Sequence, residues 1–416
     1  MYFLFKTKGE KKLINVIGLG YIGLPTSLIL AANNNKVVGT DYNFDLIKKL
    51  NQNELTFEEN GLEQLFKRAL EKEIVFRNEY ISTDFYIITV PTPYDKENKK
   101  IDPSYVISAT KEVLKVCEKG TILVIESTVS PGTIDKYIRP LVQESGLIIN
   151  EDIYLVHAPE RILPGQMIYE LENNSRTIGA DLPEIAAKVK NIYQTFCKGE
   201  IVCTDIRTAE MTKVVENTFR AVNIAFANEL TKIARYDNLD VQEIIRISNM
   251  HPRVNILNPG PGVGGHCIPV DPWFLVGDYP RLTKLISAAL EINESMPEMV
   301  LTRINDIMKE KGIKDKNKIG IYGLSYKQDV DDYRESPTIQ MFEKMSEHFA
   351  SPFRVYDPMI PKKVFETQIL NFDQFIEESE LVVVMVPHSH IKESKDILKD
   401  KIVLDPHNLF EFSYKL

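Results

Sequence analysis

The sequence predicts an α/β protein with two doubly wound, Rossmann-like domains joined by a helical domain that contains one long central helix. Three observations support this fold class. Short apolar, β-rich runs alternate with helix-permissive segments near the N-terminus, and the same alternation returns toward the C-terminus. Between them, Thr208–Asp237 contains no proline or glycine. Strand–helix alternation is typical of a parallel sheet covered by helices on both faces.

The N-terminal domain is predicted from a series of short apolar runs. Leu13–Ile17 is followed directly by a glycine-rich turn and by a helix that extends to about Asn33. The remaining strands are Lys36–Asp41, Phe85–Val90, Thr121–Glu126 and Ile153–Val156. Polar segments that permit helices separate these runs, as alternating strands and helices require.

A long amphipathic helix is predicted in the middle of the chain. Apolar residues recur there at helical spacing, at Met211, Val215, Phe219, Val222, Phe226, Leu230 and Ile233. Further helices at Val241–Asn249 and Leu282–Lys311 flank the proline- and glycine-rich stretch Pro252–Pro272. The long helix carries more apolar surface than one chain is expected to cover, so we expect a homodimer through this helix.

The C-terminal domain returns to short strands, predicted at Lys318–Tyr322, Phe353–Asp357, Leu381–Pro387 and Ile402–Asp405. The first strand leads into Gly323-Leu324-Ser325-Tyr326-Lys327, which resembles a dinucleotide turn without its later glycines and favours a different phosphate ligand. Because 416 residues exceed what one core usually holds, we predict three domains. Their boundaries are 1–206, 207–312 and 313–416.

Composition excludes several classes of protein. The chain has 59 acidic and 50 basic residues, a formal net charge of -9, which argues against a nucleic-acid partner. Its four cysteines match no zinc spacing and are too sparse for a disulfide framework, so no metal is expected. The apolar run Met1–Phe5 is too short for a signal peptide, and no stretch is long enough to span a membrane. We therefore expect a soluble cytoplasmic protein without membrane insertion.

A dinucleotide-binding turn is predicted at Gly18-x-Gly20-x-x-Gly23, between a strand and a helix. The first glycine permits the tight turn, the second lets backbone approach a pyrophosphate, and the third allows close packing of helix on strand. Asp41 ends the second strand 18 residues after Gly23. Its carboxylate can accept from ribose hydroxyls and would repel the extra phosphate of NADP, so the predicted cofactor is NAD.

The most informative stretch for chemistry runs from Gly260 to Asp271. Glycines at 260, 262, 264 and 265 precede His266 and Cys267. We interpret these glycines as a loop that brings backbone close to another group, and not as part of a packed core. A lone cysteine is usually an inert small hydrophobe. A glycine-rich loop before Cys267, with Asp271 four positions later, favours a reactive thiol instead.

The predicted long helix carries a polar face that is also a candidate site. Lys213 and Asn217 lie four residues apart and share one face, and Glu210 lies near it. Taken alone, these residues are better explained as an ordinary polar helix face.

Together these motifs resemble the UDP-glucose/GDP-mannose dehydrogenase family over nearly the whole chain. The matching segments are Gly18-x-Gly20-x-x-Gly23, Glu126-Ser127-Thr128, Pro159-Glu160, Glu210–Asn217, Gly264–Asp271, Lys327–Asp331 and Arg334–Pro337. The resemblance implies a four-electron oxidation that uses two NAD⁺ and passes through a thiohemiacetal and a thioester on Cys267. It also implies a UDP-linked substrate, and its uronic-acid products commonly feed polysaccharide synthesis.

The resemblance also assigns candidate roles to individual residues. Lys213 and Asn217 would hold the oxyanion formed at each addition. Asp271, Thr128 and Glu160 are candidates for the base or for positioning water, and their division of labour stays open. Besides the glycines and Asp41, the implied cofactor contacts are Tyr21, Ile22, Thr92, Thr128 and Arg334. The implied substrate contacts are Arg161, Lys213, Asn217, Arg253, Gly264, His266 and Lys327, with Lys327 at the uridine diphosphate.

The identity of the sugar is predicted from departures from the UDP-glucose members. The chain reads Arg161–Gly165 after Glu160, His251–Ile256 after the helices, and His266 directly before the cysteine. These stretches resemble the branch that oxidises UDP-N-acetylhexosamines. We expect UDP-N-acetyl-D-mannosamine first, UDP-N-acetylglucosamine second and UDP-glucose third. Arg161, Asn255 or His251 would meet the acetamido group.

Two readings from other classes remain open. A two-electron dehydrogenase of the 6-phosphogluconate type would share the N-terminal domain and long helix, but it would not need Cys267. A non-catalytic sensor of NAD or a nucleotide sugar would not need a nucleophile at all.

Overall fold

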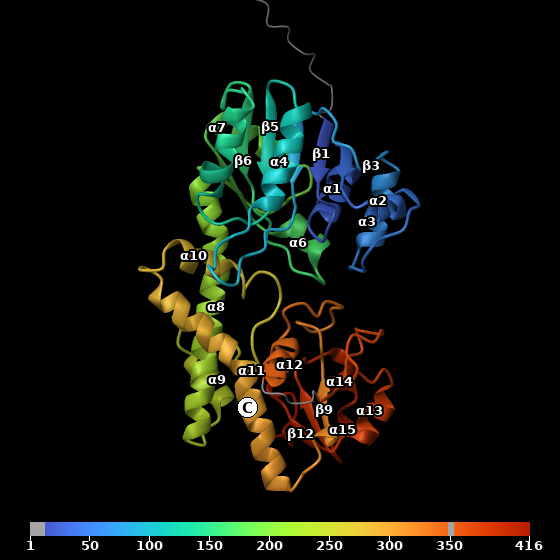
Figure 1. Ribbon diagram of the computed structural model, residues 1–416, viewed down its shortest axis with the longest axis vertical. Coiled ribbons are helices and arrows are strands. Elements are labelled where there is room, and N and C mark those ends of the chain that lie inside the picture. The colour runs from blue at the N-terminus through green and yellow to red at the C-terminus, as the bar shows by residue number, and fades with distance from the viewer. Residues whose placement is uncertain (1–12, 348–352) are drawn as a thin grey trace, which may run out of the picture. The chain divides into compact units, whose positions relative to one another are not determined.

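The computed structural model describes residues 13–347 and 353–416. Contacts within the chain define two compact units, Met1–Val215 and Glu216–Leu416, each described below by itself. The run Met1–Phe5, which we excluded as a signal-peptide core, lies outside the described residues. Figure 1 labels many of the helices and strands of both units.

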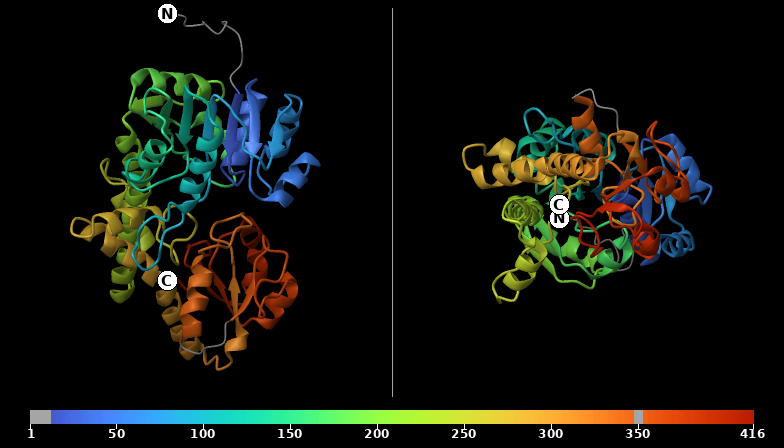
Figure 2. Two further views of the ribbon diagram at one scale, coloured as in Figure 1. Left: turned by 45° about the horizontal axis from the view of Figure 1, so that its top comes forward. Right: turned by 90° about the horizontal axis from the view of Figure 1, so that it is seen from below.

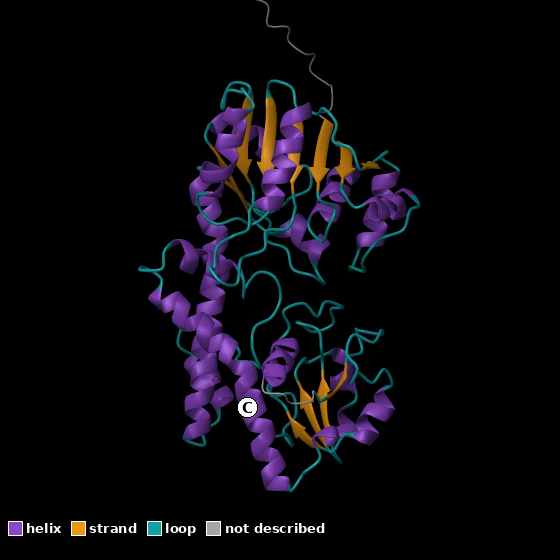
Figure 3. Cartoon of the chain, in the orientation of Figure 1, coloured by secondary structure: helices purple, strands orange, loops and turns teal. Residues whose placement is uncertain are grey.

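The first unit is built on an eight-stranded sheet with the order β3-β2-β1-β4-β5-β6-β7-β8. All of its predicted strands are present (Figure 3), as β1 (Leu13–Ile17), β2 (Lys36–Thr40), β4 (Phe85–Ile88), β5 (Thr121–Ile125) and β6 (Ile153–His157). Every residue of β4 and β5 is buried. Since successive side chains of a strand point to opposite faces, both faces of the sheet are covered at its centre.

Three strands of this sheet were not predicted, namely β3 (Val75–Arg77), β7 (Arg176–Ala180) and β8 (Ile201–Thr204). The expected parallel sheet is confirmed except at β7, which pairs antiparallel with β6. The connection after β6 keeps to the carboxyl edge of the sheet, so the chain must run back when it re-enters. The edge strands β3 and β8 are short and partly exposed, which leaves little apolar pattern to detect.

Helices of the first unit pack on this sheet. The helix after the glycine-rich turn, α1, is buried along its whole length. It packs on β1 and β2, while α4 packs on β4 and α7 on β7 and β8. The helices are α1 (Gly23–Ala32), α2 (Phe44–Asn51), α3 (Leu62–Leu70), α4 (Ser104–Val116), η1 (Ile134–Ile138), α5 (Arg139–Glu144), α6 (Met167–Asn173) and α7 (Pro183–Tyr193).

The predicted long helix is α8 (Ile206–Tyr236), with 31 residues. It begins in the first unit and ends in the second. In the second unit, buried Asn293 of α11 (Lys284–Lys311) accepts from Asn228 of α8 at 2.9 Å and donates to the carbonyl of Ala221 at 3.0 Å. These two bonds tie α8 to α11. The shorter helices are α9 (Val241–Ser248) and α10 (Asp271–Asp278).

The C-terminal sheet is parallel throughout, with the order β10-β9-β11-β12. Its strands match the predicted ones, and helices flank them on two sides (Figure 2). The strands are β9 (Ile319–Tyr322), β10 (Arg354–Tyr356), β11 (Leu381–Val384) and β12 (Ile402–Leu404). The helical elements are η2 (Lys316–Lys318), α12 (Pro337–Glu347), α13 (Phe372–Glu378), α14 (Ser389–Glu393) and α15 (Lys395–Leu398).

No helix within residues 13–347 and 353–416 is both long enough and apolar enough to cross a membrane.

Candidate functional site

The three glycines after β1 have three different surroundings. Gly18 has a φ of +91°, which favours glycine. A Cβ on Gly23 would overlap the carbonyl oxygen of Gly18 and the hydroxyl of Thr89, so the first turn of α1 packs directly on the loop. A Cβ on Gly20 would meet no atom within 4 Å. Backbone at Gly20 is therefore open to an incoming ligand, as a pyrophosphate site requires.

Asp41, directly after β2, holds this turn in place. Its Oδ2 accepts from the backbone N–H of Leu19 at 2.7 Å, and its Oδ1 accepts from that of Asn43 at 2.8 Å. The residue is 8% exposed. Each carboxylate oxygen can accept more than one hydrogen bond. The same group can therefore order the turn and receive ribose hydroxyls.

The loops after β4 and β5 are tied to each other beside this turn. Thr92 donates its hydroxyl hydrogen to the carbonyl of Thr128 at 2.7 Å, and Ser127 donates to that of Val90 at 2.6 Å. Two of the predicted cofactor residues, Thr92 and Thr128, are thus neighbours. The Tyr21 ring lies tilted against that of Phe57, with ring centroids 4.5 Å apart.

Glu160, a candidate base, lies in a buried ion pair that the sequence did not reveal. Arg176 of β7 donates to its Oε2, and the backbone N–H of Arg161 donates to its Oε1 at 2.6 Å. The Arg176 guanidinium lies 4.6 Å from the ring centroid of Tyr193 and 5.2 Å from that of Phe196. Glu160 therefore has one oriented carboxylate, fixed by β7 and by its own loop.

A second buried carboxyl, Glu126, lies in the same network. The hydroxyls of Thr26 and Tyr193 both donate to it. Burial raises the pKa of Glu126 to about 7, although nearby Arg176 acts to lower it. Thr26 belongs to α1, so this network connects the dinucleotide helix with the strand that precedes Thr128.

Arg161, predicted to meet the acetamido group, has its terminal nitrogens engaged inside the first unit. One donates to the carbonyl and hydroxyl of Ser175 at 2.9 and 3.0 Å, and the other to the hydroxyl of Thr177 at 3.0 Å. Arg161 thus fixes the start of β7 to the loop that carries Glu160. Its role toward a substrate stays a prediction.

Glu210 connects α8 to the loop that follows β5. Its fully buried carboxylate accepts from the backbone N–H groups of Gly132 and Ile134, at 2.5 and 3.0 Å. Burial raises the pKa of Glu210 to about 7, and the two backbone hydrogen bonds only partly oppose this. The bonds hold the N-terminal part of α8, with Lys213 one turn later, against the loop that begins at Thr128.

The predicted nucleophile lies in a turn that leads into α10. The carbonyl of Cys267 accepts from the backbone N–H of Asp271 at 2.8 Å. The side chain of Asn217, on α8, donates to the Asp271 carboxylate at 2.6 Å, and both residues are buried. Three predicted catalytic residues are therefore brought together by direct contacts. Lys213 lies one helical turn before Asn217, and it is also buried.

The interpretation of the glycine-rich loop needs correction, because most of it packs against protein. A Cβ on Gly264 would lie 2.9 Å from Cβ of Tyr326, and one on Gly265 would lie 2.8 Å from the Tyr326 ring. A Cβ on Gly262 would crowd Pro337 at 3.1 Å. The group that the backbone approaches is thus the loop Tyr326–Pro337 of the same unit, in a packed contact that only glycine permits.

His266 contacts the same loop through a carboxylate. Its Nε2 lies 3.2 Å from Oδ2 of Asp332, which also accepts from Arg334 at 2.8 Å. Burial acts to raise the pKa of Asp332, but the hydrogen bonds from His266 and Arg334 lower it far below its usual range. The loop before Cys267 and the predicted cofactor residue Arg334 therefore share one ionised partner.

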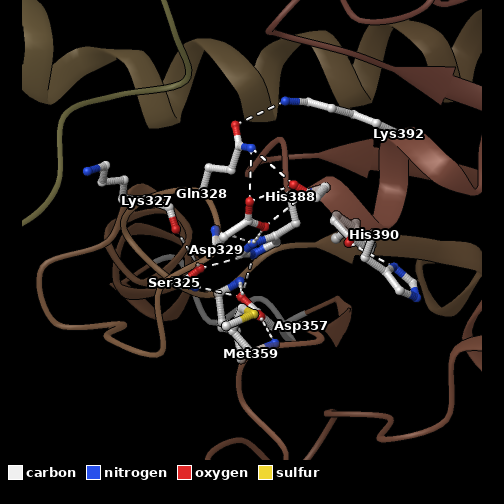
Figure 4. A network of polar contacts seen from close by, with 12 residues as sticks. Ser325, Lys327, Gln328, Asp329, Asp357, Met359, His388, His390 and Lys392 are labelled. Atoms are coloured by element: carbon white, nitrogen blue, oxygen red, sulfur yellow. Dashed lines mark hydrogen bonds and ion pairs between the residues drawn. The ribbon is translucent and has the colours of Figure 1, made fainter. Parts of the chain in front are cut away.

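The turn after β9 repeats the device found after β1. Gly323 has a φ of +101°, and Oδ2 of Asp357 accepts from the N–H groups of Leu324 and Ser325 at 2.6 and 2.8 Å. Here the carboxylate is covered by buried His388, whose Nε2 lies 3.3 Å away (Figure 4). Asp357 ends a predicted strand as Asp41 does, so this signal was present in the sequence and was missed.

His388 also fixes the loop that carries Lys327. Its Nδ1 accepts from the backbone N–H of Asp329 at 2.9 Å, which places the ring proton on Nε2. Ser325 lies 3.1 Å from Nε2 but is fully buried, so this is a structural cluster and not an accessible nucleophile. Lys327 extends from the loop and is exposed.

The loop after α9 contains the remaining predicted residues. His251, Arg253 and Asn255 are all exposed there. The side chain of Asn223, on α8, holds the loop by donating to the carbonyl of Asn255 at 2.8 Å. The contact predicted between these residues and a substrate stays a prediction.

Comparison with protein families gives matches along most of the chain. Family descriptions for the UDP-glucose/GDP-mannose dehydrogenases match in three regions. The NAD binding domain matches residues 12–197, the central domain 207–295 and the UDP binding domain 320–412.

Individual relatives cover nearly the whole chain. The UDP-N-acetyl-D-mannosamine dehydrogenase of Methanococcus maripaludis is 43% identical over 414 residues, 97% of this chain and 94% of that protein. The enzyme of that name from Campylobacter jejuni is 39% identical, over 93% of this chain and 97% of its own length. A Ralstonia nicotianae NDP-N-acetyl-D-galactosaminuronic acid dehydrogenase is 37% identical, over 95% and 96%.

Solved structures agree with these relatives. The UDP-D-ManNAc dehydrogenase of Pyrococcus horikoshii superposes with a TM-score of 0.89 at 35% identity, covering 97% of this chain and 98% of that one. The UDP-N-acetyl-mannosamine dehydrogenase Cap5O of Staphylococcus aureus gives 0.87 at 38% identity, with the same coverage. With the open backbone at Gly20 and the carboxylate of Asp41, these matches identify the cofactor as NAD.

The different surroundings of Gly20 and Gly23 lead to opposite effects of alanine. We expect Gly20→Ala to fold normally, because its Cβ meets no protein atom, but to bind NAD at least about tenfold more weakly, since the methyl group occupies the pyrophosphate approach. Gly23→Ala should lower the free energy of unfolding by about 1–3 kcal/mol through overpacking. Calorimetric NAD titration and urea unfolding measure the two effects. Equal destabilisation by both substitutions would contradict this assignment.

The raised pKa of Glu210 predicts a pH-dependent stability. A carboxyl with a raised folded pKa stabilises fully below its unfolded pKa of 4.5, and this contribution is lost as pH rises through about 7. Relative to the wild type, Glu210→Gln should therefore gain up to about 3 kcal/mol of unfolding free energy between pH 4.5 and 8. Urea unfolding across this range measures the difference. Exposed Glu184→Gln is the control, and a flat difference for both variants would refute the burial of this charge.

Proposed function

Because the chain belongs to the UDP-glucose/GDP-mannose dehydrogenase family, we propose that it oxidises the C6 alcohol of UDP-N-acetyl-D-mannosamine to the carboxylate. The observation that carries this proposal is the cluster of Asn217, Asp271 and Cys267. It provides a thiol, an amide donor and a carboxyl group within one short segment and one helix face. A two-electron dehydrogenase or a sensor has no use for this combination.

The proposed reaction is a four-electron oxidation with a covalent intermediate. The substrate alcohol and one water are converted to the carboxylate, two hydrides and three protons. Loss of the first hydride gives an aldehyde, and the Cys267 thiolate adds to its carbon to form a thiohemiacetal. Loss of the second hydride leaves a thioester, which water cleaves to release the acid and the thiol. When bound, NAD supplies the acceptor for each hydride.

The residues around Cys267 fit the requirements of these steps. The nucleophile must be the thiolate, because the thiol is a poor nucleophile. Asn217 and Lys213 lie one turn apart and can donate to the oxygen that becomes an oxyanion at each addition. Asn217 uses one amide hydrogen on Asp271 and retains a second.

Three residues remain candidates for the proton acceptor. Asp271 is the acid nearest to Cys267 in the chain, and its backbone bonds to that residue. The Glu160 carboxylate already accepts hydrogen bonds from Arg176 and from the backbone N–H of Arg161. Because these bonds hold it in one orientation, it is better suited to orienting water than to accepting the thiol proton. Thr128 contributes its carbonyl to Thr92. This favours Asp271 as the proton acceptor.

The substrate's nucleotide and sugar would be bound by separate groups. We propose that exposed Lys327 meets the diphosphate, that Gly264 and His266 line the approach to Cys267, and that Arg334 extends to the cofactor. Arg253, exposed after α9, would contact the substrate, and Arg161, Asn255 or His251 the acetamido group. Relatives named for N-acetyl-D-mannosamine and for N-acetyl-D-galactosaminuronic acid support a 2-acetamido sugar. UDP-N-acetylglucosamine and then UDP-glucose are the alternatives.

We also propose a homodimer through α8. Four apolar side chains on this helix are between 47% and 66% exposed, namely Val215, Phe219, Phe226 and Ile233. Large apolar groups repeated along one helix usually mark an interface, and a second copy of α8 offers a matching surface. Within this proposal the chain has three functional domains, 1–206, 207–312 and 313–416.

The reaction is tested by counting NADH for each sugar. We expect UDP-N-acetyl-D-mannosamine to yield two NADH per molecule consumed, because the oxidation proceeds to the acid. Turnover should exceed that of UDP-N-acetylglucosamine, UDP-N-acetylgalactosamine and UDP-glucose by about tenfold or more, since a sugar that lacks the acetamido group, or carries it in another configuration, leaves the polar groups that bind it unpaired. Absorbance at the NADH band and mass spectrometry of the product measure both quantities.

The Cys267→Ser variant is the matched control for this test. It should form little carboxylate, with kcat lowered by about a thousandfold or more, while NAD binding is unchanged. Cys203→Ser, at an exposed cysteine, should retain wild-type turnover. One NADH per substrate, or full activity of Cys267→Ser, would favour a two-electron dehydrogenase. No NADH with any of the sugars would favour a sensor.

The dimer is tested by placing charge on the apolar face of α8. The double variant Phe219→Asp/Phe226→Asp should weaken self-association by about a hundredfold or more, because it buries unpaired charges. Analytical ultracentrifugation measures this change. Tyr169→Asp, at a 67% exposed aromatic on α6, is the control and should stay associated. A double variant that still sediments as a dimer would show that α8 is not the interface.

A further inference from the structure

One carboxylate in the second unit joins the loop before the nucleophile to the loop that follows β9. Asp332 is 8% exposed, and each of its oxygens accepts hydrogen bonds. Its Oδ2 lies 3.2 Å from Nε2 of His266 and 2.8 Å from a terminal nitrogen of Arg334, while Oδ1 accepts from Nε of Arg334 at 2.9 Å. Two side chains from different segments are therefore oriented by one acid.

The contact between the two loops is reinforced by close packing. The backbone N–H of Tyr326 donates to the carbonyl of Asp332 at 2.9 Å, which closes the loop on itself. The Tyr326 side chain then packs on Gly264 through its Cβ and on Gly265 through its ring, and the ring meets that of His266 edge-on at 6.4 Å between centroids. Residues on both sides of Asp332 thus contact the segment that ends at Cys267.

We propose that Asp332 is a positioning residue. Through His266 it fixes the loop that ends at Cys267 against the loop Tyr326–Pro337, here called the nucleotide loop, which carries Lys327. It also fixes the side chain of Arg334 on the nucleotide loop. This inference rests on the proposed function in one respect, namely that Cys267 is the nucleophile. A ligand bound to the loop Tyr326–Pro337 then stabilises the loop before Cys267, because the His266–Asp332 contact links the two loops.

The exposure of the partners distinguishes this role from that of an ordinary buried ion pair. The side chain of His266 is 45% exposed and that of Arg334 is 53% exposed, whereas that of Asp332 is 8% exposed. The acid does not neutralise a buried cation. It anchors two groups that extend into solvent, one beside Cys267 and one on the nucleotide loop. A displacement of about 1 Å at a reacting atom is enough to cost about a hundredfold in rate.

The first test uses the reactivity of Cys267 and needs no turnover. Full-length wild type, Asp332→Ala, His266→Ala and the control Asp400→Ala, an exposed aspartate of the same unit, are treated with iodoacetamide. Peptide mapping separates Cys267 from the other three cysteines. We expect alkylation of Cys267 to be about threefold or more faster in Asp332→Ala and His266→Ala, because the loop is no longer held. UDP should slow alkylation of Cys267 in the wild type by a similar factor. It should have no effect on the rate in Asp332→Ala or His266→Ala.

The second test separates positioning from stability in the steady state. Asp332→Ala should lower kcat by about 10- to 100-fold with KM changed by less than about threefold. Asp332→Asn retains an acceptor for Arg334 and should recover part of kcat. Because His266→Ala removes the same link, the Asp332→Ala/His266→Ala variant should lose no more than about twofold beyond Asp332→Ala.

Several outcomes would overturn the proposal. Wild-type alkylation rates in Asp332→Ala would do so, as would additive losses in the double variant. A fall in melting temperature at unchanged kcat would reduce Asp332 to a structural ion pair. Failure of the proposed function is recognised separately, by the absence of turnover with every sugar. In that case the alkylation rates measured without UDP still test whether Asp332 holds the loop before Cys267.

Discussion

The candidate site depends on one buried hydrogen bond, between Asn217 of α8 and Asp271 at the start of α10. Both side chains are almost fully buried, and the bond is 2.6 Å long, as expected when the acceptor is charged. It fixes the start of α10 on α8, and the Asp271 backbone in turn holds the carbonyl of Cys267. Loss of Asn217 would leave the buried Asp271 carboxylate without this donor. The free-energy cost of that loss exceeds the net stabilisation that the hydrogen bond provides.

The two sheets use the same device for opposite purposes. In the first unit, Asp41 after β2 accepts a backbone N–H of the turn that follows β1. In the second unit, Asp357 after β10 accepts from the turn that follows β9 in the same way. Asp41 retains acceptor capacity, and backbone at Gly20 is open, so the first turn receives NAD. Asp357 is covered by His388, so the second turn presents Lys327 and not its own backbone (Figure 4). The buried imidazole of His388 thus occupies the side of Asp357 that corresponds to the side of Asp41 on which ribose hydroxyls are expected to bind.

Buried charge organises the first unit around its candidate residues. Arg176 forms an ion pair with Glu160. Burial raises the pKa of Glu126, and the hydrogen bonds from Thr26 and Tyr193 partly oppose this. Such a network adds little net stability, since desolvation offsets attraction, but removal of one member leaves the others unpaired. Its consequence is orientation of the loops after β5 and β6, which carry Thr128 and Glu160.

The sequence by itself determined the fold class, the long helix and the identity of the main catalytic candidates, because strand–helix periodicity and the GxGxxG and GGHC motifs are local signals. Asn217 and Lys213 were predicted to share a face, which helical spacing alone dictates. Only the tertiary structure decided the antiparallel β7, the Arg176–Glu160 pair, and the role of Gly264 and Gly265 in packing against Tyr326. Each depends on contact between segments far apart in the chain, and no local pattern records which distant residue a buried charge or a bare backbone will meet.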